Sequence, residues 1–389
     1  MRDDTINIGE RLRQIKSLQS STANSYQELV NRAAAYLALD CAEEALADYD
    51  RAVLLKPDQI LAHMKRFPVL NRLDMIDRML DAANEILAIT PGESIGYFHL
   101  GMALSRLGRD QESVEAYTRA IEISPREPAA YVNRSAGYAS LGFMDKCLAD
   151  CEKAHSIKPG MISAYINKAL ALRCMGEQQK AIKVCNEALG IEADSPLAYC
   201  NRAMANFVLN KDKQAFDDID LAIRFSTQPF YVAKCKAIKA KFLADLGGGG
   251  GNSGGNDGDD WRQWIDEARG LCDSAVCIAS ENSSPWRYAW STSALISGIM
   301  GDFDAANSNV QLVLDRSRSF IYGINIKARV LLMQDRLDEA LVTVNSALVL
   351  NAKDPESNYI RYLIRTRQND ARAQDDLARA RELGYLRDQ

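Results

Sequence analysis

The chain has 389 residues, 47% of them hydrophobic, and its 52 acidic residues outnumber its 47 basic ones. A net charge of −5 gives no basic field that could neutralise a phosphate backbone, so we expect no nucleic-acid partner. The length would allow two or three ordinary domains, but length is a weak guide where a chain repeats itself.

Nine cysteines occur without any CxxC pair, and His63, His99 and His155 lack the spacing of a zinc site. We therefore expect reduced thiols, no metal and no cofactor, in a cytoplasmic protein. The first residues carry charges where a signal peptide would need an apolar core, and no later apolar run reaches the ~18 residues of a membrane span. The sequence thus predicts no membrane insertion.

Residues 1–25 are predicted to form an N-terminal extension or capping helix, with apolar side chains at helical spacing: Ile8, Leu12, Ile15 and Leu18. This helix would cover the open end of the helices that follow. The alternative is that the segment occupies a groove formed by those helices.

A period of 34 residues governs the segment 26–229, where Pro57, Pro91, Pro125 and Pro159 recur at that interval. With these prolines at the thirty-second position, the segment divides into six contiguous units without an inserted or lost residue. The interval is that of a helix-turn-helix repeat.

The fifteenth position of each unit predicts where its first helix ends. It is occupied only by aspartate, glycine or asparagine, the residues that best tolerate a left-handed backbone: Asp40, Asp74, Gly108, Gly142, Gly176 and Asn210. We expect a positive φ angle at each of them.

Both helices of a unit carry an apolar face. The second helix alternates small and large residues at its core positions, as in Ala45, Tyr49 and Ala52, and again in Ser113, Tyr117 and Ala120. The first helix carries a stripe in which a glycine admits its neighbour, as in Tyr97, Leu100, Gly101 and Leu104. Each unit is therefore an antiparallel helix pair that buries its apolar faces by stacking.

These positions resemble the tetratricopeptide repeat (TPR) family. The unit 60–93 departs from the pattern, with Phe67 and Pro68 in mid-helix and Ala83 and Ile86 at core positions of its second helix. The resemblance implies an all-α fold: a right-handed superhelical solenoid of about ten antiparallel helix-turn-helix (TPR) repeats.

Beyond residue 229 the pattern weakens. Residues 230–284 are predicted to be a degenerate unit with a flexible glycine-rich insertion at 247–260, which lacks the strand and the lysine of a phosphate-binding loop. Two further units follow at 287–354, and residues 355–389 are predicted to be C-terminal capping helices.

In this family the first helices line a concave groove, and their second, fifth, sixth and ninth positions face the ligand. Here the sixth position holds mostly asparagine: Asn31, Lys65, His99, Asn133, Asn167 and Asn201. This row resembles the asparagine ladder of the O-linked N-acetylglucosamine transferase repeats. An asparagine amide can match the N–H and C=O of a peptide group irrespective of the peptide's sequence.

Two rows beside the asparagines are apolar. The fifth position holds Met64, Phe98, Val132 and Ile166, and the ninth holds Met102, Leu170 and Met204. Such a lining favours an apolar or amphipathic partner segment. The alternative interpretation is that both rows, and the asparagines, pack against neighbouring helices.

The carboxylate clamp, which grips acidic tails of heat-shock chaperones, is a known use of this fold. It needs five polar residues at set positions in three successive repeats. Only Asn133 matches, because Phe98 and Met102 precede it and Ser163 and Asn167 follow it at the other positions. Binding of chaperone tails is therefore disfavoured.

Taken together, these patterns predict a non-enzymatic protein-protein interaction scaffold or adaptor. It would bind an extended or amphipathic peptide segment of another protein in its concave groove, roughly over residues 94–235. No catalytic constellation is present in the sequence. The alternatives are a structural scaffold that associates with copies of itself and a regulatory arm of an enzyme complex.

Overall fold

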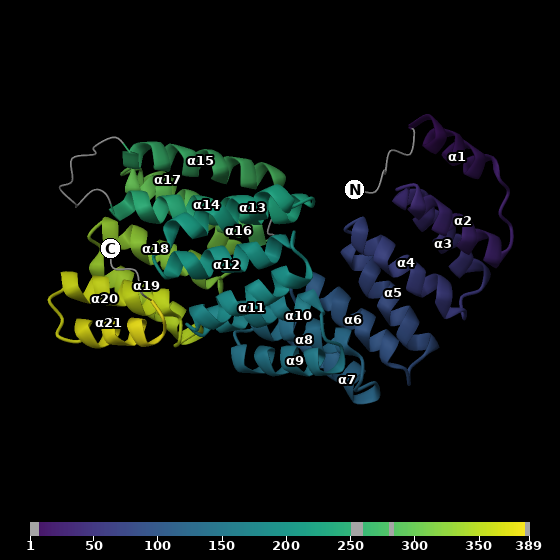
Figure 1. Ribbon diagram of the computed structural model, residues 1–389, viewed down its shortest axis with the longest axis horizontal. Helices are drawn as coiled ribbons and strands as arrows, with labels where there is room; N and C mark the ends of the chain where they lie inside the picture. Colours follow the sequence, from purple (N-terminus) through teal and green to yellow (C-terminus); the bar gives the residue numbers. More distant parts are fainter. Residues whose placement is uncertain (1–7, 250–259, 280–283, 386–389) are drawn as a thin grey trace. The chain divides into compact units, whose positions relative to one another are not determined.

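The computed structural model describes residues 8–249, 260–279 and 284–385. These residues form 21 helices and no strand (Figure 1). The chain divides into two compact units, Met1–Pro159 and Gly160–Gln389, hereafter unit 1 and unit 2. Each unit is a stack of antiparallel helix pairs in which every helix packs on the next.

Unit 1 holds one leading helix and four helix pairs within its described residues. The leading helix is α1 (Ile8–Ser20), and the pairs are α2 (Tyr26–Ala38) with α3 (Ala42–Leu55), α4 (Ile60–Arg72) with α5 (Ile76–Ile89), α6 (Ser94–Arg106) with α7 (Asp110–Ile123), and α8 (Pro128–Ser140) with α9 (Met144–Ile157). Leu18 of α1 packs against the apolar core that α2 and α3 begin. Pro68 lies inside α4 without ending it.

Unit 2 holds six helix pairs in its described part. They are α10 (Ile162–Cys174) with α11 (Gln178–Ile191), α12 (Pro196–Val208) with α13 (Asp212–Phe225), α14 (Pro229–Gly249) with α15 (Asp260–Ile278), α16 (Ser284–Ile299) with α17 (Phe303–Arg316), α18 (Ile321–Met333) with α19 (Leu337–Leu350), and α20 (Pro355–Arg367) with α21 (Ala373–Glu382). First helices also contact each other directly, as α14 does with α16 and α16 with α18.

The predicted helix stops are confirmed. All six residues at the fifteenth position have positive φ angles, from 56° at Asn210 to 81° at Gly176. The same conformation recurs later at the same interval, at Gly301, Asp335 and Asn369. The period is therefore expressed in the backbone of both units.

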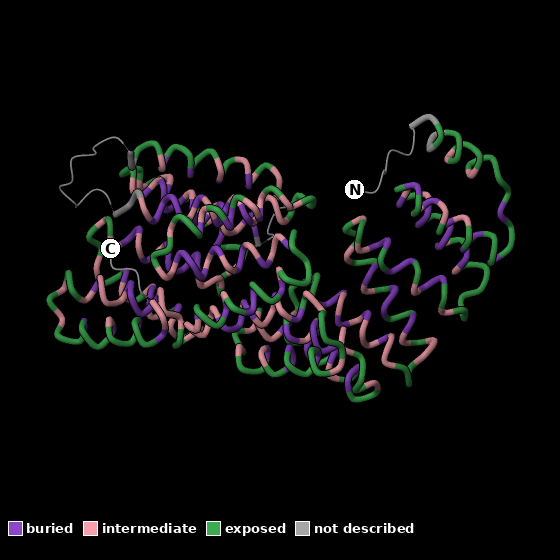
Figure 2. Tube along the Cα trace, in the orientation of Figure 1, coloured by how far each residue is buried: buried purple, intermediate pink, exposed green. Residues whose placement is uncertain are grey.

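The predicted core positions of the second helices are buried. Tyr49 and Tyr117 are among the largest fully buried side chains of the described residues. A Cβ atom added to Gly101 would lie 2.8 Å from the Tyr117 ring, so this glycine is what lets α7 approach α6. Figure 2 shows the resulting buried stripes along the helices.

A repeated ion pair also ties first to second helices. The guanidinium groups of Arg32, Arg134 and Arg202 each donate two hydrogen bonds of 2.6–2.9 Å to the aspartate sixteen residues later: Asp48, Asp150 and Asp218. Each carboxylate is buried, so the pair fixes one packing geometry within its repeat.

The glycine-rich insertion is shorter in the structure than the predicted 247–260. Helix α14 continues to Gly249, and α15 begins at Asp260. Residues 250–259 lie outside the described part of the chain, so the expected flexibility of the insertion stays a prediction. No helix in the described residues is long and apolar enough to cross a membrane.

Candidate functional site

The asparagine row begins on the surface of unit 1. Asn31 is exposed on α2, and its Oδ1 atom accepts a hydrogen bond of 2.9 Å from Nε2 of Gln27. Asn133 is half-buried on α8, and its side chain hydrogen-bonds to the buried Tyr117. Asn133 therefore has a packing partner as well as an exposed side.

His99, at the sixth position of α6, is a core residue. Its Nδ1 atom lies 2.8 Å from the carbonyl oxygen of Ile95, and its ring packs edge-on against Phe67 at 4.5 Å and against Phe98 at 5.8 Å. Burial lowers the pKa of His99, and the hydrogen bond to Ile95 opposes that shift only in part. This environment favours the neutral imidazole.

The apolar rows of unit 1 are buried to different degrees. Phe98 and Met102 on α6 are half-buried, as is Met64 on α4, whereas Val132 on α8 is buried. Leu61, one turn before Met64, is 42% exposed. Sequence reasoning did not single out Leu61. This residue occupies the second position of the 34-residue repeat 60–93, which the family pattern assigns to the ligand.

In unit 2 the same rows are more enclosed. Asn201 and Ile166 are buried, and Ile166 packs with Ala188 and Ala198. Asn167, Leu170 and Met204 are half-buried. Packing within the chain therefore accounts for four of the predicted site residues, namely His99, Val132, Ile166 and Asn201.

A network of charged side chains, which sequence reasoning missed, joins three first helices of unit 2. Asp245 on α14 lies 2.8 Å from Arg329 on α18 and 2.8 Å from Lys241, and Lys241 lies 3.6 Å from Glu356 on α20. Their side chains are only 8–23% exposed. The two cations and two carboxylates thus compensate each other inside the unit.

Burial and charge act in opposite directions on the two acids of this network. Burial alone would raise the pKa of Asp245, but Lys241 and Arg329 lower it to about 2. At Glu356 burial dominates, with a further contribution from Asp245, and the pKa is raised. The cations therefore hold Asp245 ionised more firmly than Glu356.

Aromatic rings adjoin the network. Tyr288 of α16 stacks on Tyr322 of α18 with 4.8 Å between the ring centroids, and Lys241 lies 5.5 Å from the Tyr322 ring. The Tyr322 hydroxyl lies 3.0 Å from that of Thr292. The second position of a 34-residue repeat is occupied by Tyr288, by Tyr322 and by Glu356. In unit 2, positions that the family pattern assigns to the ligand therefore contact the chain's own side chains.

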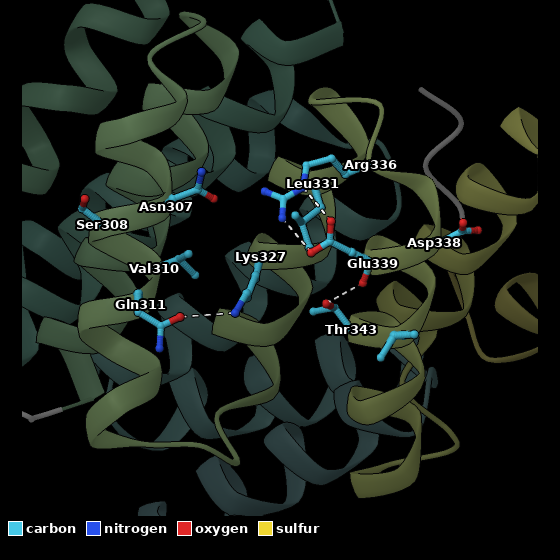
Figure 3. Close-up of a pocket in the computed structure, with 11 residues that line it drawn as sticks. Asn307, Ser308, Val310, Gln311, Lys327, Leu331, Arg336, Asp338, Glu339 and Thr343 are labelled. Carbon is cyan, nitrogen blue, oxygen red and sulfur yellow. Dashed lines mark hydrogen bonds and ion pairs between the residues drawn. The ribbon is translucent and has the colours of Figure 1, made fainter.

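A pocket of about 700 Å³ lies among α17, α18 and α19, all of which contribute lining residues (Figure 3). Its charged side chains are largely paired with neighbours: Lys327 donates to Gln311 at 3.2 Å, and Arg336 makes two hydrogen bonds to Glu339 at 2.8 and 2.6 Å. These charged groups are therefore already engaged within the chain, which argues against a small-molecule site built on them.

The described residues contain no group of three or more His, Cys, Asp and Glu side chains placed to hold a metal ion. All nine cysteines are free thiols, and six of them are buried. At Cys272, burial raises the thiol pKa to about 12, as expected for a small apolar filler of the core.

Comparisons with known proteins agree with this architecture. The model of the tetratricopeptide repeat family matches residues 94–127 and again residues 162–195. The Cut9–Hcn1 hetero-tetramer of the APC/C is similar over 95% of this chain and 66% of that chain, with 15% identity and a TM-score of 0.55. This likeness extends over the whole repeat stack and concerns the fold.

Two further solved structures match about half of the chain. TTC0263, a thermophilic TPR protein in Thermus thermophilus, covers 52% of this chain and 97% of its own, with 21% identity and a TM-score of 0.39. YrrB, described as a TPR protein with an unusual peptide-binding site, covers 48% and 95%, with 21% identity and a TM-score of 0.36. No curated protein matches the chain.

Fold and repeated turn together define an all-α repeat solenoid. The kind of repeat is identified by the stacked helix pairs, by the 34-residue period and by the two repeats, 94–127 and 162–195, that match the family model. The chain is a tetratricopeptide repeat protein.

Proposed function

We propose that the protein is a non-enzymatic scaffold or adaptor that binds a segment of a partner protein on the first helices of unit 1. The observation that supports this proposal is the partly exposed apolar row on α4 and α6, formed by Leu61, Met64, Phe98 and Met102. Large apolar side chains are mostly buried in a folded protein, so a group of them on one wall indicates a contact surface.

The chemistry of the row suits an apolar or amphipathic segment. Two methionines and a phenylalanine offer adaptable, polarisable contacts that do not demand one particular sequence. Asn31 and Asn133 flank the row in the chain and could add hydrogen bonds to the partner's backbone, each worth a net ~0.5–1.5 kcal/mol. Orientation would come from the amides and affinity from the apolar contacts.

The proposal is tested by capturing partners from cell extract with a variant of the row and a matched control. The double variant Leu61→Asp, Phe98→Ala changes two first helices of unit 1. The control Leu54→Asp changes an 81% exposed leucine on the second helix α3 of the same unit. Circular dichroism must first show that both variants are as helical as the wild type.

We expect the double variant to lose the captured partner and the Leu54 variant to keep it. Synthetic peptides spanning the partner would then locate the bound segment. Equal capture by all three proteins would contradict the proposal and direct attention to the second helices or to unit 2.

The asparagine ladder has its own test, the triple variant Asn133→Ala, Asn167→Ala, Asn201→Ala. Because Asn201 is buried and Asn133 bonds Tyr117, this variant also changes packing. Asn31→Ala is the cleaner probe, since Asn31 is exposed on α2. Retention of partner by a folded Asn31→Ala variant would exclude that rung.

Self-association through the same apolar row is the second candidate function. The exposed Leu61 beside half-buried methionines would serve a second copy as well as another protein. Sedimentation velocity at several concentrations separates the two functions. Concentration-dependent growth that Leu61→Asp abolishes would favour self-association, and a constant monomer would favour a different partner.

A further inference from the structure

Two segments of unit 2 that are far apart in the chain meet at their backbones. Gly176 follows α10 with a φ of 81°, and Gly384 follows α21 with a φ of 87°. A Cβ atom added to Gly176 would overlap the carbonyl group of Leu383, and one added to Gly384 would lie 2.6 Å from the carbonyl oxygen of Gly176. Only glycine at both places permits this approach.

Residues 383–385, here called the closing turn, are folded and packed. The amides of Gly384 and Tyr385 donate 2.9 Å hydrogen bonds back to the carbonyls of Arg381 and Ala380. The Leu383 side chain is buried, and the Tyr385 ring stacks on Tyr359 of α20 with centroids 4.3 Å apart. Burial raises the pKa of the Tyr385 phenol, and Glu356 and Asp245 act in the same direction.

The contact joins the first helix pair of unit 2 to the last. Successive pairs from α10/α11 to α20/α21 already pack in chain order, so the contact of Gly176 with the closing turn makes their order circular. Within this circle, Lys241, Asp245, Arg329 and Glu356 bridge α14, α18 and α20. Arg173 and Cys174 at the end of α10 lie close enough to Tyr288 of α16 to influence its pKa.

We infer that unit 2 is held shut by the closing turn, an intramolecular contact that keeps its first helices occupied by the chain's own side chains. The inference rests on the proposed function and restricts it: a partner segment binds unit 1, and unit 2 accepts one only when the closing turn leaves Gly176. The face formed by the first helices of unit 2 is therefore occupied by residues 383–385 together with the four-residue charge network.

The charge network would make opening of the circle an all-or-none event. Parting α18 from α14 would separate Arg329 from Asp245, and a buried charge without its partner is strongly disfavoured. Two discrete arrangements, shut and open, are consequently favoured over a continuous range.

Hydrogen exchange measured by mass spectrometry tests the contact without any partner. The test variant is Gly176→Ala, whose Cβ would overlap the Leu383 carbonyl. The matched control is Gly301→Ala, because Gly301 has the equivalent turn position and a φ of 80°, but no atom within 4 Å of an added Cβ. Both variants share the strain of a positive φ, and only Gly176→Ala opposes the closing turn.

In Gly176→Ala we expect amide exchange in the distant peptide 376–385 to accelerate about tenfold or more, while Gly301→Ala leaves that peptide within about twofold of the wild type. The reciprocal variant Tyr385→Ala should accelerate exchange in peptide 170–178. Far-ultraviolet circular dichroism establishes that all variants stay helical.

If peptide 376–385 exchanges equally in both glycine variants and Tyr385→Ala leaves 170–178 unchanged, the closing contact does not exist in solution and the inference is overturned. This result would leave partner binding by unit 1 untouched, because the capture experiment uses Leu61, Phe98 and Leu54 only. Equal capture by the wild type and both capture variants, together with accelerated exchange of peptide 376–385 in Gly176→Ala, would conversely remove the proposed function and keep the closing turn.

Discussion

The two units apply the same repeat to different ends. In unit 1 the first helices α4 and α6 leave Leu61, Met64, Phe98 and Met102 partly exposed, whereas in unit 2 the equivalent faces of α14, α18 and α20 carry charges and rings that contact one another. The helix-pair backbone is common to both. The difference lies in the class of side chain on one face of the first helices. The repeat geometry provides this face in both units, and the side chains on it decide whether it is open to a partner or covered by contacts within the chain.

The largest expected effect comes from removing Arg329 from the charge network. Arg329→Met deletes one of the two cations that lie 2.8 Å from Asp245 and leaves this buried carboxylate to Lys241 alone. We expect unit 2 to lose about 3–5 kcal/mol of unfolding free energy, measured by urea denaturation. A loss no greater than that of an exposed substitution would mean that the network is solvated and that the contrast between the units is false.

A smaller loss is expected from crowding the core of unit 1. Gly101→Ala places a Cβ 2.8 Å from the Tyr117 ring, and such overpacking typically costs about 1–3 kcal/mol. Gly108→Ala is the control, since its positive φ of 71° is strained but no atom lies within 4 Å of the added Cβ. A Gly101→Ala variant that is as stable as the wild type would mean that the close approach of α6 and α7 contributes nothing.

The two acids of the network should respond to neutralisation with opposite signs. Asp245 has a folded pKa of about 2, below the ordinary 3.8, so its ionisation stabilises the fold above pH 3.8 and this contribution is lost as pH falls towards 2. Glu356 has a raised pKa, so its ionisation costs stability once pH exceeds the folded pKa. At pH 7 we expect Asp245→Asn to destabilise and Glu356→Gln to be neutral or stabilising.

Thermal unfolding at pH 7 and at pH 3 measures this difference. Asp245→Asn should lie closer to the wild type at pH 3 than at pH 7, because the wild type has then begun to lose the same interaction. Equal destabilisation by both variants at pH 7 would show that the cations hold the two carboxylates alike.

The smallest effect is expected for a side chain that lies outside both the apolar row of unit 1 and the charge network of unit 2. Val349 on α19 is 86% exposed, and Val349→Ser should change the unfolding free energy by no more than about 0.5 kcal/mol. Partner capture should be unaffected as well. A clear loss of partner would place the binding surface on the second helices of unit 2 and would reverse the proposed division of roles.

Much of the fold could be predicted because its determinants are local. The residues at Asp40, Gly142 and Asn210 announce a left-handed turn by their type, and a fixed period then places every helix around them. The repeated Arg–Asp pair had an equally local signal, an arginine at the seventh position and an aspartate at the twenty-third, which the sequence reasoning overlooked.

The site was less predictable because exposure depends on neighbours. Asparagines at one repeat position, Asn31 and Asn201, end exposed and buried respectively, according to what packs beside them. Asp245 and Arg329 are 84 residues apart, and no spacing rule connects them. From the sequence alone, the charged residues of the network resemble those of ordinary solvent-exposed helix faces. Only the packing of the helices shows that they are paired.

The contact of Gly176 with the closing turn alters how unit 2 can unfold. An open stack of repeats has two free ends, from which unfolding proceeds pair by pair with one interface broken at each step. A stack joined end to start has no free end, so releasing any first pair requires two interfaces to break together. Unit 2 should accordingly melt in one cooperative step, resist fraying and resist proteases that attack loosened termini, while unit 1 sheds its helix pairs singly.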